Sequence, residues 1–396
     1  MKNAYMQWFY GKIHNFKLAN ILANILYGLQ ILKYKIEIRK FGNQKNLLEY
    51  KEAIKLLEKE SPCPTISFHK EKKMIKEEKD IDLSIIVPVY NYKDVLRETI
   101  DSIVGQKTQY VYEVILVDDG SSDGSEKIVD EYRIYKNVNI IHQQNSGIAE
   151  ARNTGICNSR GRYVMFVDCD DILKDNMVKV MLDDIIKKQS DISECGFYYF
   201  KKQGTNATKK RIFTYPEKIL NEGNREILKY PGLPWAKIYK RELFEDTRFP
   251  KGFWFEDTLI HFIIFQKCKK ISFVNQCLYG YRVYENNYTK VQQKSKRSIE
   301  HLWIIKYMIQ YANYLKIKTK TDLFYETTLN HLGPILCNGT LFLGSEIHKA
   351  LFSVASEYLT KVEKPQKIKL NYMLKELENS LMTKNYEKWK LVCKYI

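Results

Sequence analysis

The sequence lacks any paired arrangement of cysteines. Its eight cysteines include no C-x-x-C pair and no Cys/His cluster at metal-ligand spacing, so neither a structural zinc site nor a disulfide framework is indicated. Reduced thiols are the usual state of cytosolic proteins. We therefore expect a cytoplasmic protein.

Long hydrophobic runs are missing as well. The uncharged stretch 18–32, the most apolar part of the N-terminal segment, has only 15 residues and carries Asn20, Asn24 and Gln30. A helix that crosses a bilayer needs about 20 apolar residues. The first ten residues also lack the compact apolar core and the cleavage site of a signal peptide. The sequence therefore favours contact with a membrane surface, at most, over a membrane span.

Acidic residues are too few to balance the basic ones, and the formal net charge is +17. The imbalance lies at the ends: the net charge is +7 in residues 1–80, +2 in residues 81–290 and +8 in residues 291–396. Basic ends suit an anionic partner such as membrane headgroups, a lipid diphosphate or nucleic acid. Solubility alone is the alternative explanation.

The same boundaries divide the chain into three predicted segments: a helical N-terminal extension and linker (1–80), an α/β domain (81–290) and a C-terminal helical region (291–396). In the first segment, apolar residues alternate at spacings of four and three, the pattern of a helix that packs on another helix. They are Leu18, Leu22, Ile25, Leu29 and Leu32. An in-plane membrane helix, a seam of a homo-oligomer and a cap on the chain's own core all fit this pattern.

The stretch 161–171 combines an apolar run with a cluster of carboxylates. Residues 163–167 read as a strand buried on both faces, and Asp168, Asp170 and Asp171 follow at once. Burying several like charges is costly, so we expect them at the open end of the strand, where α/β sheets bind ligands. Asp168 and Asp170 share one side of an extended chain and suit a hard divalent ion that also holds a phosphate. An acidic helix N-cap is the alternative.

Strands and helices alternate around this stretch. Strands are predicted at 83–91, 112–117, 138–142 and 163–167, with helical patterns between them. This alternation is typical of βαβ units in a mostly parallel sheet, and right-handed crossovers place all the strand C-ends at one edge. The polar segments 88–91, 118–125 and 168–171 should therefore converge.

Six short motifs that fall into five groups follow one another in a fixed order. They are SIIVPVYN (84–91), VDDGSSD (117–123), NSG (145–147) with ARN (151–153), DCDD (168–171) and ED (256–257). Their order across residues 82–285 resembles that of family 2 glycosyltransferases. The resemblance implies a GT-A fold, which is a Rossmann-like, mostly parallel sheet flanked by helices. It also implies metal-dependent, inverting transfer of a sugar from a nucleotide-sugar, UDP-sugar being the expected donor.

The resemblance implies donor-binding roles for five residues. Pro88 and Tyr90 would line the nucleotide base of the donor, and the side chain of Tyr90 would stack on the ring of that base. Asp119 would accept a hydrogen bond from a uracil imide N–H. Asn145 and Arg152 would lie near the base and the diphosphate.

The same resemblance implies the residues of the metal site and the catalytic base. Asp168 and Asp170 would touch the ribose and hold Mn²⁺ or Mg²⁺ between the diphosphate oxygens. A divalent ion stabilises a leaving diphosphate without proton transfer. Asp257, beside Glu256, would take the proton of the acceptor hydroxyl, which is otherwise a poor nucleophile. One base opposite the leaving group gives a single displacement with inversion, by the geometric logic of two-carboxylate glycoside hydrolysis.

Four further residues resemble family positions in the acceptor pocket and in a closing loop. Trp235 and Lys237 would shape the acceptor pocket, and Tyr281 and Arg282 would belong to a closing loop. The expected acceptor is a glycan or a lipid-linked glycan in cell-surface polysaccharide synthesis at the inner face of the membrane.

Two other readings of the chain compete with this one. A sugar-phosphate nucleotidyltransferase normally has a Gly-rich loop with basic residues after its first strand, and 88–91 has neither. A non-enzymatic basic scaffold or nucleic-acid-binding protein would account for the net charge. It would not account for acidic clusters at three strand ends, which repel phosphate unless a metal intervenes. We therefore expect no nucleic-acid partner.

Overall fold

The computed structural model describes residues 16–39, 47–68, 73–201, 208–283 and 295–396. The predictions that concern residues 1–15 lie outside these ranges. The chain divides into two compact units. The first, here called the sheet unit, contains Ser67–Ile227 and Pro231–Asn287; the second, here called the helical unit, contains Met1–Ile66, Leu228–Tyr230 and Tyr288–Ile396. Whether the three segments predicted from the sequence are separate domains stays a prediction.

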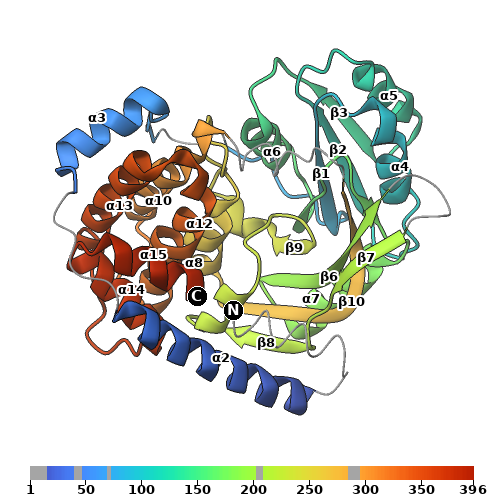
Figure 1. The fold of residues 1–396 in the computed structure, drawn as a ribbon. Coiled ribbons are helices and arrows are strands. Elements are labelled where there is room, and N and C mark those ends of the chain that lie inside the picture. Colours follow the sequence, from blue (N-terminus) through green and yellow to red (C-terminus); the bar gives the residue numbers. More distant parts are fainter. Residues whose placement is uncertain (1–15, 40–46, 69–72, 202–207, 284–294) are drawn as a thin grey trace. The chain divides into compact units, whose positions relative to one another are not determined.

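The sheet unit is built on one mixed sheet, which has ten strands within the described ranges (Figure 1). The strands are β1 (Leu83–Val89), β2 (Tyr112–Asp118), β3 (Val138–His142), β4 (Tyr163–Phe166), β5 (Ile172–Leu173), β6 (Ile192–Lys201), β7 (Thr208–Phe213), β8 (Lys218–Asn221), β9 (Lys237–Lys240) and β10 (Lys270–Arg282). Their order is β3-β2-β1-β4-β9-β6-β10-β5, with β7 beside β6 and β8 beside β10.

The strand directions divide this sheet into two halves. In the first half, β3, β2, β1 and β4 are all parallel. In the second half, β9 is antiparallel to β4 and β6, while β6 and β10 are parallel to each other. The prediction of a mostly parallel sheet is confirmed for the motif-bearing half.

Helices cover both faces of the parallel half (Figure 1). They are α4 (Lys93–Val104), α5 (Ser125–Glu131) and α6 (Ile148–Cys157). Helix α7 (Met177–Lys188) packs on β6, β9 and β10 of the second half, and the short α8 (Phe265–Lys267) lies near the end of this unit's chain, before β10. Every residue of β1 is buried, as expected of a strand covered on both sides. Residues from α4 and α7 share one core with Leu83, Ile85 and Val87. On the opposite face α6 comes so close that a Cβ on Gly155 would lie 2.3 Å from the side chain of Ile86, so glycine is needed there.

The four strands predicted before the acidic triplet are confirmed as β1 to β4, with boundaries that differ by at most two residues. The helix predicted over 258–267 is different in the structure. A π turn, Ile260–Ile264, precedes the single α-helical turn of α8, so the segment after Asp257 is wider than an α-helix. Wide turns of this kind are frequent at functional sites.

The helical unit contains the described parts of both chain ends. Its α-helices are α2 (Phe16–Ile38), α3 (Tyr50–Glu60), α10 (Glu300–Tyr314), α11 (Asp322–Asn330), α12 (Leu336–Thr340), α13 (Ser345–Thr360), α14 (Tyr372–Met382) and α15 (Tyr386–Tyr395). Trp303 of α10 is fully buried and donates a hydrogen bond to the carbonyl of Ser61 at 2.9 Å, which ties the end of α3 to α10. Of the helices in the described ranges, none has the length and apolar character to cross a bilayer.

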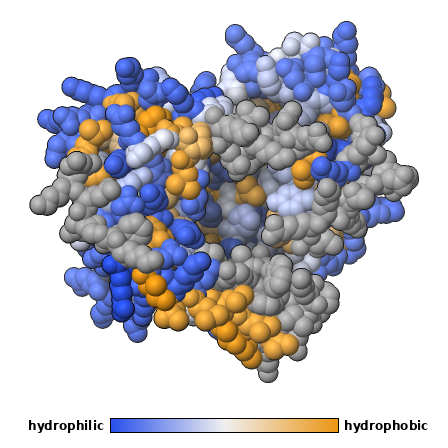
Figure 2. Space-filling model, in the orientation of Figure 1, coloured by the Kyte–Doolittle hydropathy of each residue, from blue (hydrophilic) through white to orange (hydrophobic). Residues whose placement is uncertain are grey.

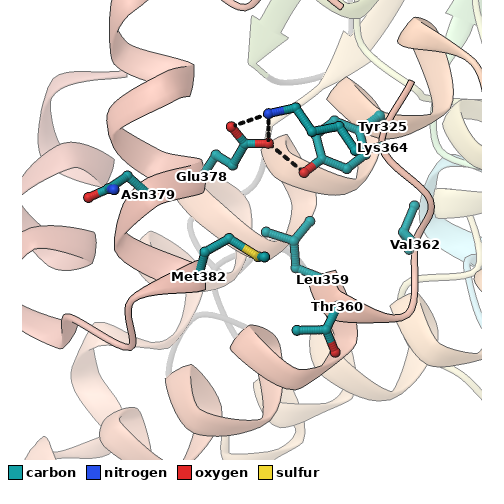
Figure 3. A pocket seen from close by; sticks show the side chains of 8 residues that line it. All are labelled: Tyr325, Leu359, Thr360, Val362, Lys364, Glu378, Asn379 and Met382. Carbon is teal, nitrogen blue, oxygen red and sulfur yellow. Dashed lines mark hydrogen bonds and ion pairs between the residues drawn. The ribbon is translucent and has the colours of Figure 1, made fainter. Parts of the chain in front are cut away.

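A cavity of about 290 Å³ lies among α11, α13 and α14 of the helical unit (Figure 3). Its one acidic side chain, Glu378, accepts hydrogen bonds from the Tyr325 hydroxyl at 2.6 Å and from Lys364 Nζ at 2.8 Å. The carboxylate is therefore already neutralised. None of the predicted site residues lines this cavity.

Candidate active site

The carboxyl ends of the parallel strands meet at one edge of the sheet. β1 and β2 end opposite each other at Val89 and Asp118, and β4 pairs with the other side of β1. The amide of Asp119 donates a hydrogen bond to the Val89 carbonyl at 2.8 Å, and Asp168 follows the end of β4 by two residues. The three polar segments that follow these strands thus converge, as the alternation of strands and helices predicts.

One carboxylate of the acidic triplet holds the loop in place. Asp171 is fully buried and accepts hydrogen bonds from the Tyr279 hydroxyl at 2.7 Å and from the Arg282 amide at 2.8 Å. Burial, together with the nearby charge of Asp170, raises the pKa of Asp171 well above its ordinary value. The guanidinium of Arg282 donates to the carbonyl of Asp170 and to the carboxylate of Glu98, both at 2.7 Å. Strand β10 therefore fixes the loop that follows β4.

The prediction that Tyr281 and Arg282 form a closing loop is wrong. Both residues belong to β10, where they pair with Tyr199 and Phe200 of β6. Arg282 is only 2% exposed, and its guanidinium lies 4.6 Å from the centre of the Phe200 ring. The ladder between β6 and β10 continues to this point, so both residues are part of the sheet.

Asp168 and Asp170 remain at the open edge of the sheet. The Asp168 side chain is 24% exposed. Burial, and then the charge of Asp168, raise the pKa of Asp170 to about 7. No group of three or more His, Cys, Asp or Glu side chains within the described ranges is arranged to hold a metal ion. Magnesium commonly uses one or two carboxylates together with substrate phosphates, and two hard oxygen donors whose charges repel each other fit that pattern.

A buried arginine joins the acidic loop to the second carboxylate pair. Arg152 of α6 is 2% exposed and donates to Asp168 Oδ1 at 2.9 Å and to Glu256 Oε1 at 2.6 Å. Its guanidinium also lies 5.4 Å from the centre of the Phe249 ring. Burial lowers the pKa of Arg152, but the two carboxylates outweigh it and hold the pKa above its usual range. The resemblance places Arg152 near the diphosphate. The sequence gives no sign of this bridge, because residues 152 and 256 are 104 positions apart.

The two members of the carboxylate pair differ in their surroundings. Glu256 is 7% exposed and bound to Arg152, and burial raises its pKa. Asp257 is half-buried, and burial followed by the charge of Glu256 raises its pKa to about 7. A carboxylate with such a pKa holds a proton well enough to act as a general base near neutral pH.

Asp119 has a structural role in addition to its predicted contact with the nucleotide base. The side chain is 2% exposed and accepts hydrogen bonds from the Ser146 amide at 2.9 Å, the Gly147 amide at 2.8 Å and the Gln143 side chain at 2.7 Å. It therefore orders the loop before α6. The predicted hydrogen bond to a uracil imide stays a prediction.

The other predicted base-binding residues surround the ends of β1 and β3. Pro88 is buried within β1, whereas Tyr90, the first residue after β1, is 46% exposed. Asn145 is exposed in the loop that Asp119 orders. An exposed aromatic residue beside a strand end can stack on a flat ligand ring, and the contact of Tyr90 with the nucleotide base stays a prediction.

Trp235 and Lys237 support the site from the interior. Trp235 is buried, and its ring stacks on Tyr279 with centroids 4.8 Å apart and an interplanar angle of 12°. Lys237 Nζ donates to the carbonyl of Leu233 at 2.9 Å and lies 3.4 Å from the carboxylate of Glu194. Burial lowers the pKa of Lys237. Both residues hold the segment before β9, so any effect on an acceptor pocket is exerted through that segment.

Replacement of Gly120 by alanine is expected to destabilise the fold by about 1–3 kcal/mol and to weaken the binding of UDP that the resemblance implies. Gly120 has a φ of +74°, and a Cβ there would lie 2.9 Å from the Asn145 amide nitrogen. The loop ordered by Asp119 would have to move. Urea unfolding gives the stability change, and calorimetry with UDP gives the change in binding.

Gly124→Ala is the matched control for this substitution. Gly124 also has a positive φ, +104°, but a Cβ there meets nothing within 4 Å. Its alanine variant should carry a similar cost in backbone strain and keep UDP affinity. Equal loss of UDP affinity in both variants would contradict the role assigned to the contact with the loop.

Comparison with known proteins gives a consistent result. Residues 84–248 match the model of the family described as "Glycosyl transferase family 2". Glycosyltransferase GlyG of Streptococcus pneumoniae serotype 4 is 34% identical over 212 residues, which make up 50% of this chain and 70% of GlyG. Glycosyltransferase GlyA of the same organism is 32% identical over 223 residues, which make up 54% of this chain and 32% of GlyA. The chain thus spans about a third of GlyA.

Two further similarities extend over most of the other protein. A putative teichuronic acid biosynthesis glycosyltransferase of Bacillus subtilis, TuaG, is 27% identical over 251 residues, or 61% of this chain and 97% of TuaG. The crystal structure of S. aureus TarS 1–349 in complex with UDP superposes with a TM-score of 0.50 at 20% sequence identity. This match covers 79% of this chain and 90% of the TarS chain. At that identity the likeness shows the fold.

Proposed function

This chain belongs to glycosyl transferase family 2 and has the GT-A fold, and from this premise we propose that it is a metal-dependent, inverting glycosyltransferase. It would move a sugar from a nucleotide-sugar to a hydroxyl group of a glycan or a lipid-linked acceptor. The observation that carries the proposal is the bridge formed by Arg152. It holds Asp168 of the acidic loop and Glu256 of the carboxylate pair at 2.9 and 2.6 Å, respectively, from one guanidinium group. In this proposal Arg152 joins the part of the site that would hold the metal to the part that would carry the catalytic base.

Asp168 and Asp170 would hold the donor through a divalent ion. The ion, when bound, neutralises the charge that develops on the leaving diphosphate. Asp171 takes no part in binding in this proposal, since its oxygens are occupied by Tyr279 and Arg282. It keeps the two ligand carboxylates at the edge of the sheet.

Asp257 would act as the catalytic base. It is the more accessible member of the carboxylate pair, whereas Glu256 is engaged with Arg152. Asp257 would take the proton of the acceptor hydroxyl as its oxygen attacks the sugar carbon opposite the leaving diphosphate. The new bond then forms on the face opposite the broken one, so an α-linked donor gives a β-linked product. Glu256 would position Arg152.

The substrate class is proposed from two similarities. TarS, which shares the fold, was crystallised with UDP, so a uridine nucleotide is the first donor to test. TuaG is named for teichuronic acid biosynthesis, which makes a cell-surface polysaccharide the first acceptor class to test.

The decisive experiment is a donor screen. UDP-Glc, UDP-Gal, UDP-GlcNAc and UDP-GalNAc are incubated in turn with the full chain and Mn²⁺ or Mg²⁺, and the UDP released is measured. We expect slow hydrolysis of one donor that EDTA stops and either ion restores. Hydrolysis that EDTA does not affect would contradict the metal assignment. The absence of turnover with any nucleotide-sugar would contradict the proposed function.

The rate of transfer should rise as pH increases through about 7. Asp257 must be ionised to accept a proton, and burial beside Glu256 raises its pKa to about 7. The other charged groups around the pair are Arg152 and Asp168. Below that pKa the ionised fraction falls about tenfold for each pH unit. The value of kcat/KM, measured between about pH 5.5 and 8.5, should follow this curve; a flat profile would contradict the assignment of the base.

A further inference from the structure

Helix α2 packs against the helical unit through one narrow face. Ala19, Ala23 and Tyr34 on that face are fully buried. The Tyr34 hydroxyl donates to Glu376 at 2.7 Å, and the Tyr34 ring lies edge-on against the rings of Tyr372 and Tyr395. The helix is therefore anchored to α14 and α15 by small residues and one tyrosine.

The opposite face of α2 is apolar and exposed. Five large side chains, here called the α2 stripe, are between 55% and 57% exposed. They are Ile21, Ile25, Leu29, Leu32 and Ile36. Their spacings of four, four, three and four residues keep them on one side of the helix, over about 22 Å of its length at 1.5 Å per residue. Figure 2 shows apolar side chains gathered along α2 at the lower edge of the view.

The apolar seam predicted from the sequence for this helix differs from the α2 stripe. It includes Leu22, which is half-buried in the structure, and omits Ile21 and Ile36, which are exposed. The seam predicted by strict three-four alternation thus lies partly against the protein. Three of its residues, Ile25, Leu29 and Leu32, face outward as members of the α2 stripe.

The charges around the α2 stripe are of one sign. Lys33, Lys35 and Arg39 are exposed. Glu37, which is the single acidic residue of α2, accepts hydrogen bonds from the Tyr395 hydroxyl at 2.7 Å and from Lys394 Nζ at 3.4 Å. The outward side of this helix therefore combines an apolar row with cationic side chains and no available carboxylate.

We propose that the α2 stripe binds the surface of an anionic bilayer, with α2 parallel to the membrane plane. An apolar row flanked by lysine and arginine is the pattern of a helix that lies at the headgroup boundary, and each basic residue there gains from anionic lipid. Asn20, Asn24 and Gln30 make the helix too polar to enter the bilayer core. A second copy of this chain would cover the apolar row but would offer the cations no carboxylate from α2, since Glu37 is already bound. The proposal does not depend on the proposed function.

The test uses the full chain and vesicle flotation. The vesicles contain phosphatidylcholine either alone or with about 30% phosphatidylglycerol. We expect binding to the anionic vesicles at low salt, and binding about 10²-fold weaker to the neutral vesicles because three basic residues lose their counter-charges. Ile25→Glu/Leu29→Glu should lower binding to anionic vesicles at least about tenfold, because it places carboxylates in the apolar row.

A matched pair of substitutions separates the stripe from general effects of charge. Leu341→Glu/Phe342→Glu also replaces two exposed apolar residues of the helical unit by glutamate, and it should bind anionic vesicles like the wild type. Circular dichroism and thermal unfolding check that both variants are folded. Light scattering at high salt measures the oligomeric state of each.

Three results would overturn the proposal. One is a wild-type protein that ignores anionic vesicles, and another is equal binding to neutral and anionic vesicles. The third is a wild-type dimer that Ile25→Glu/Leu29→Glu converts to a monomer without any change in vesicle binding, which would assign the stripe to a second copy of the chain. Loss of vesicle binding together with unchanged sugar transfer in the stripe variant would support the proposal.

Discussion

Replacement of Asp257 by Asn is expected to lower kcat for sugar transfer by about 10²–10⁴-fold, the usual contribution of a general base. The amide keeps the size of the side chain but cannot take the proton of the acceptor. Donor binding should be unchanged, because the residues proposed to hold the donor are elsewhere. Steady-state transfer kinetics and calorimetry with UDP and Mn²⁺ measure the two effects separately.

The stability of the same variant provides an internal check. Burial raises the pKa of Asp257 above its value in the unfolded chain. Between these two pKa values the folded protein keeps a proton that the unfolded chain has lost, so stability falls as pH rises through this range and remains lower above it. Asparagine carries no such proton. Asp257→Asn should therefore unfold at the same temperature as the wild type, or at a higher one, when measured at about pH 8.

Glu245→Gln is the control, since Glu245 is an exposed carboxylate of the same region and should retain full activity. If Asp257→Asn transfers sugar at nearly the wild-type rate, the base lies elsewhere. Glu256 would then be the first residue to test. A large loss of thermal stability in Asp257→Asn would also contradict the assignment, because the fold would then depend on the ionised carboxylate.

Replacement of Asp170 by Ala is expected to lower the affinity for UDP in the presence of Mn²⁺ by at least about 100-fold. Removal of an outer-shell partner of a metal typically costs 10–100-fold, and a direct ligand should cost no less. The protein itself should not be destabilised, because the repulsion from Asp168 that raises the pKa of Asp170 disappears. Calorimetry with UDP in the presence and absence of Mn²⁺ measures the effect.

Asp175→Ala is the matched control for this prediction. Asp175 is exposed and pairs with Lys107 at 2.7 Å on the surface, and such pairs contribute little to stability. Its variant should bind UDP with Mn²⁺ as the wild type does. If Asp170→Ala binds UDP equally well with and without the metal, and as tightly as the wild type, Asp170 is not a ligand of the ion.

The parallel half of the sheet was predictable because local signals in the sequence agree with one another. The apolar runs in β1 and β4 end in polar residues, and helical patterns separate the strands. These features follow from burial on both faces and from the handedness of crossovers. The meeting of Tyr90, Asp119 and Asp168 at one edge therefore needs no knowledge of side-chain packing.

The roles of individual polar residues were less predictable, because they depend on partners far away in the sequence. Asp171 is held by a strand that begins about a hundred residues later, and Arg152 is held by Glu256. Lys237 shows the same limit: the sequence places it near the acceptor pocket, whereas the structure surrounds it with backbone carbonyls and Glu194. Charge and spacing do not distinguish a lysine that contacts a ligand from one that supports a loop.

The distance between Asp171 and Arg282 along the chain also sets when the acidic loop can become ordered during synthesis. The two residues are 111 positions apart, and a ribosome adds about 5–20 residues per second. For several seconds the nascent chain therefore carries the parallel strands and the aspartates without Tyr279, Arg282 or the partner strand of β6. Pairing over such separations is slow to form. A ribosome-stalled chain that ends before β10 should be cut by protease in the acidic loop, and a chain extended past β10 should be protected there.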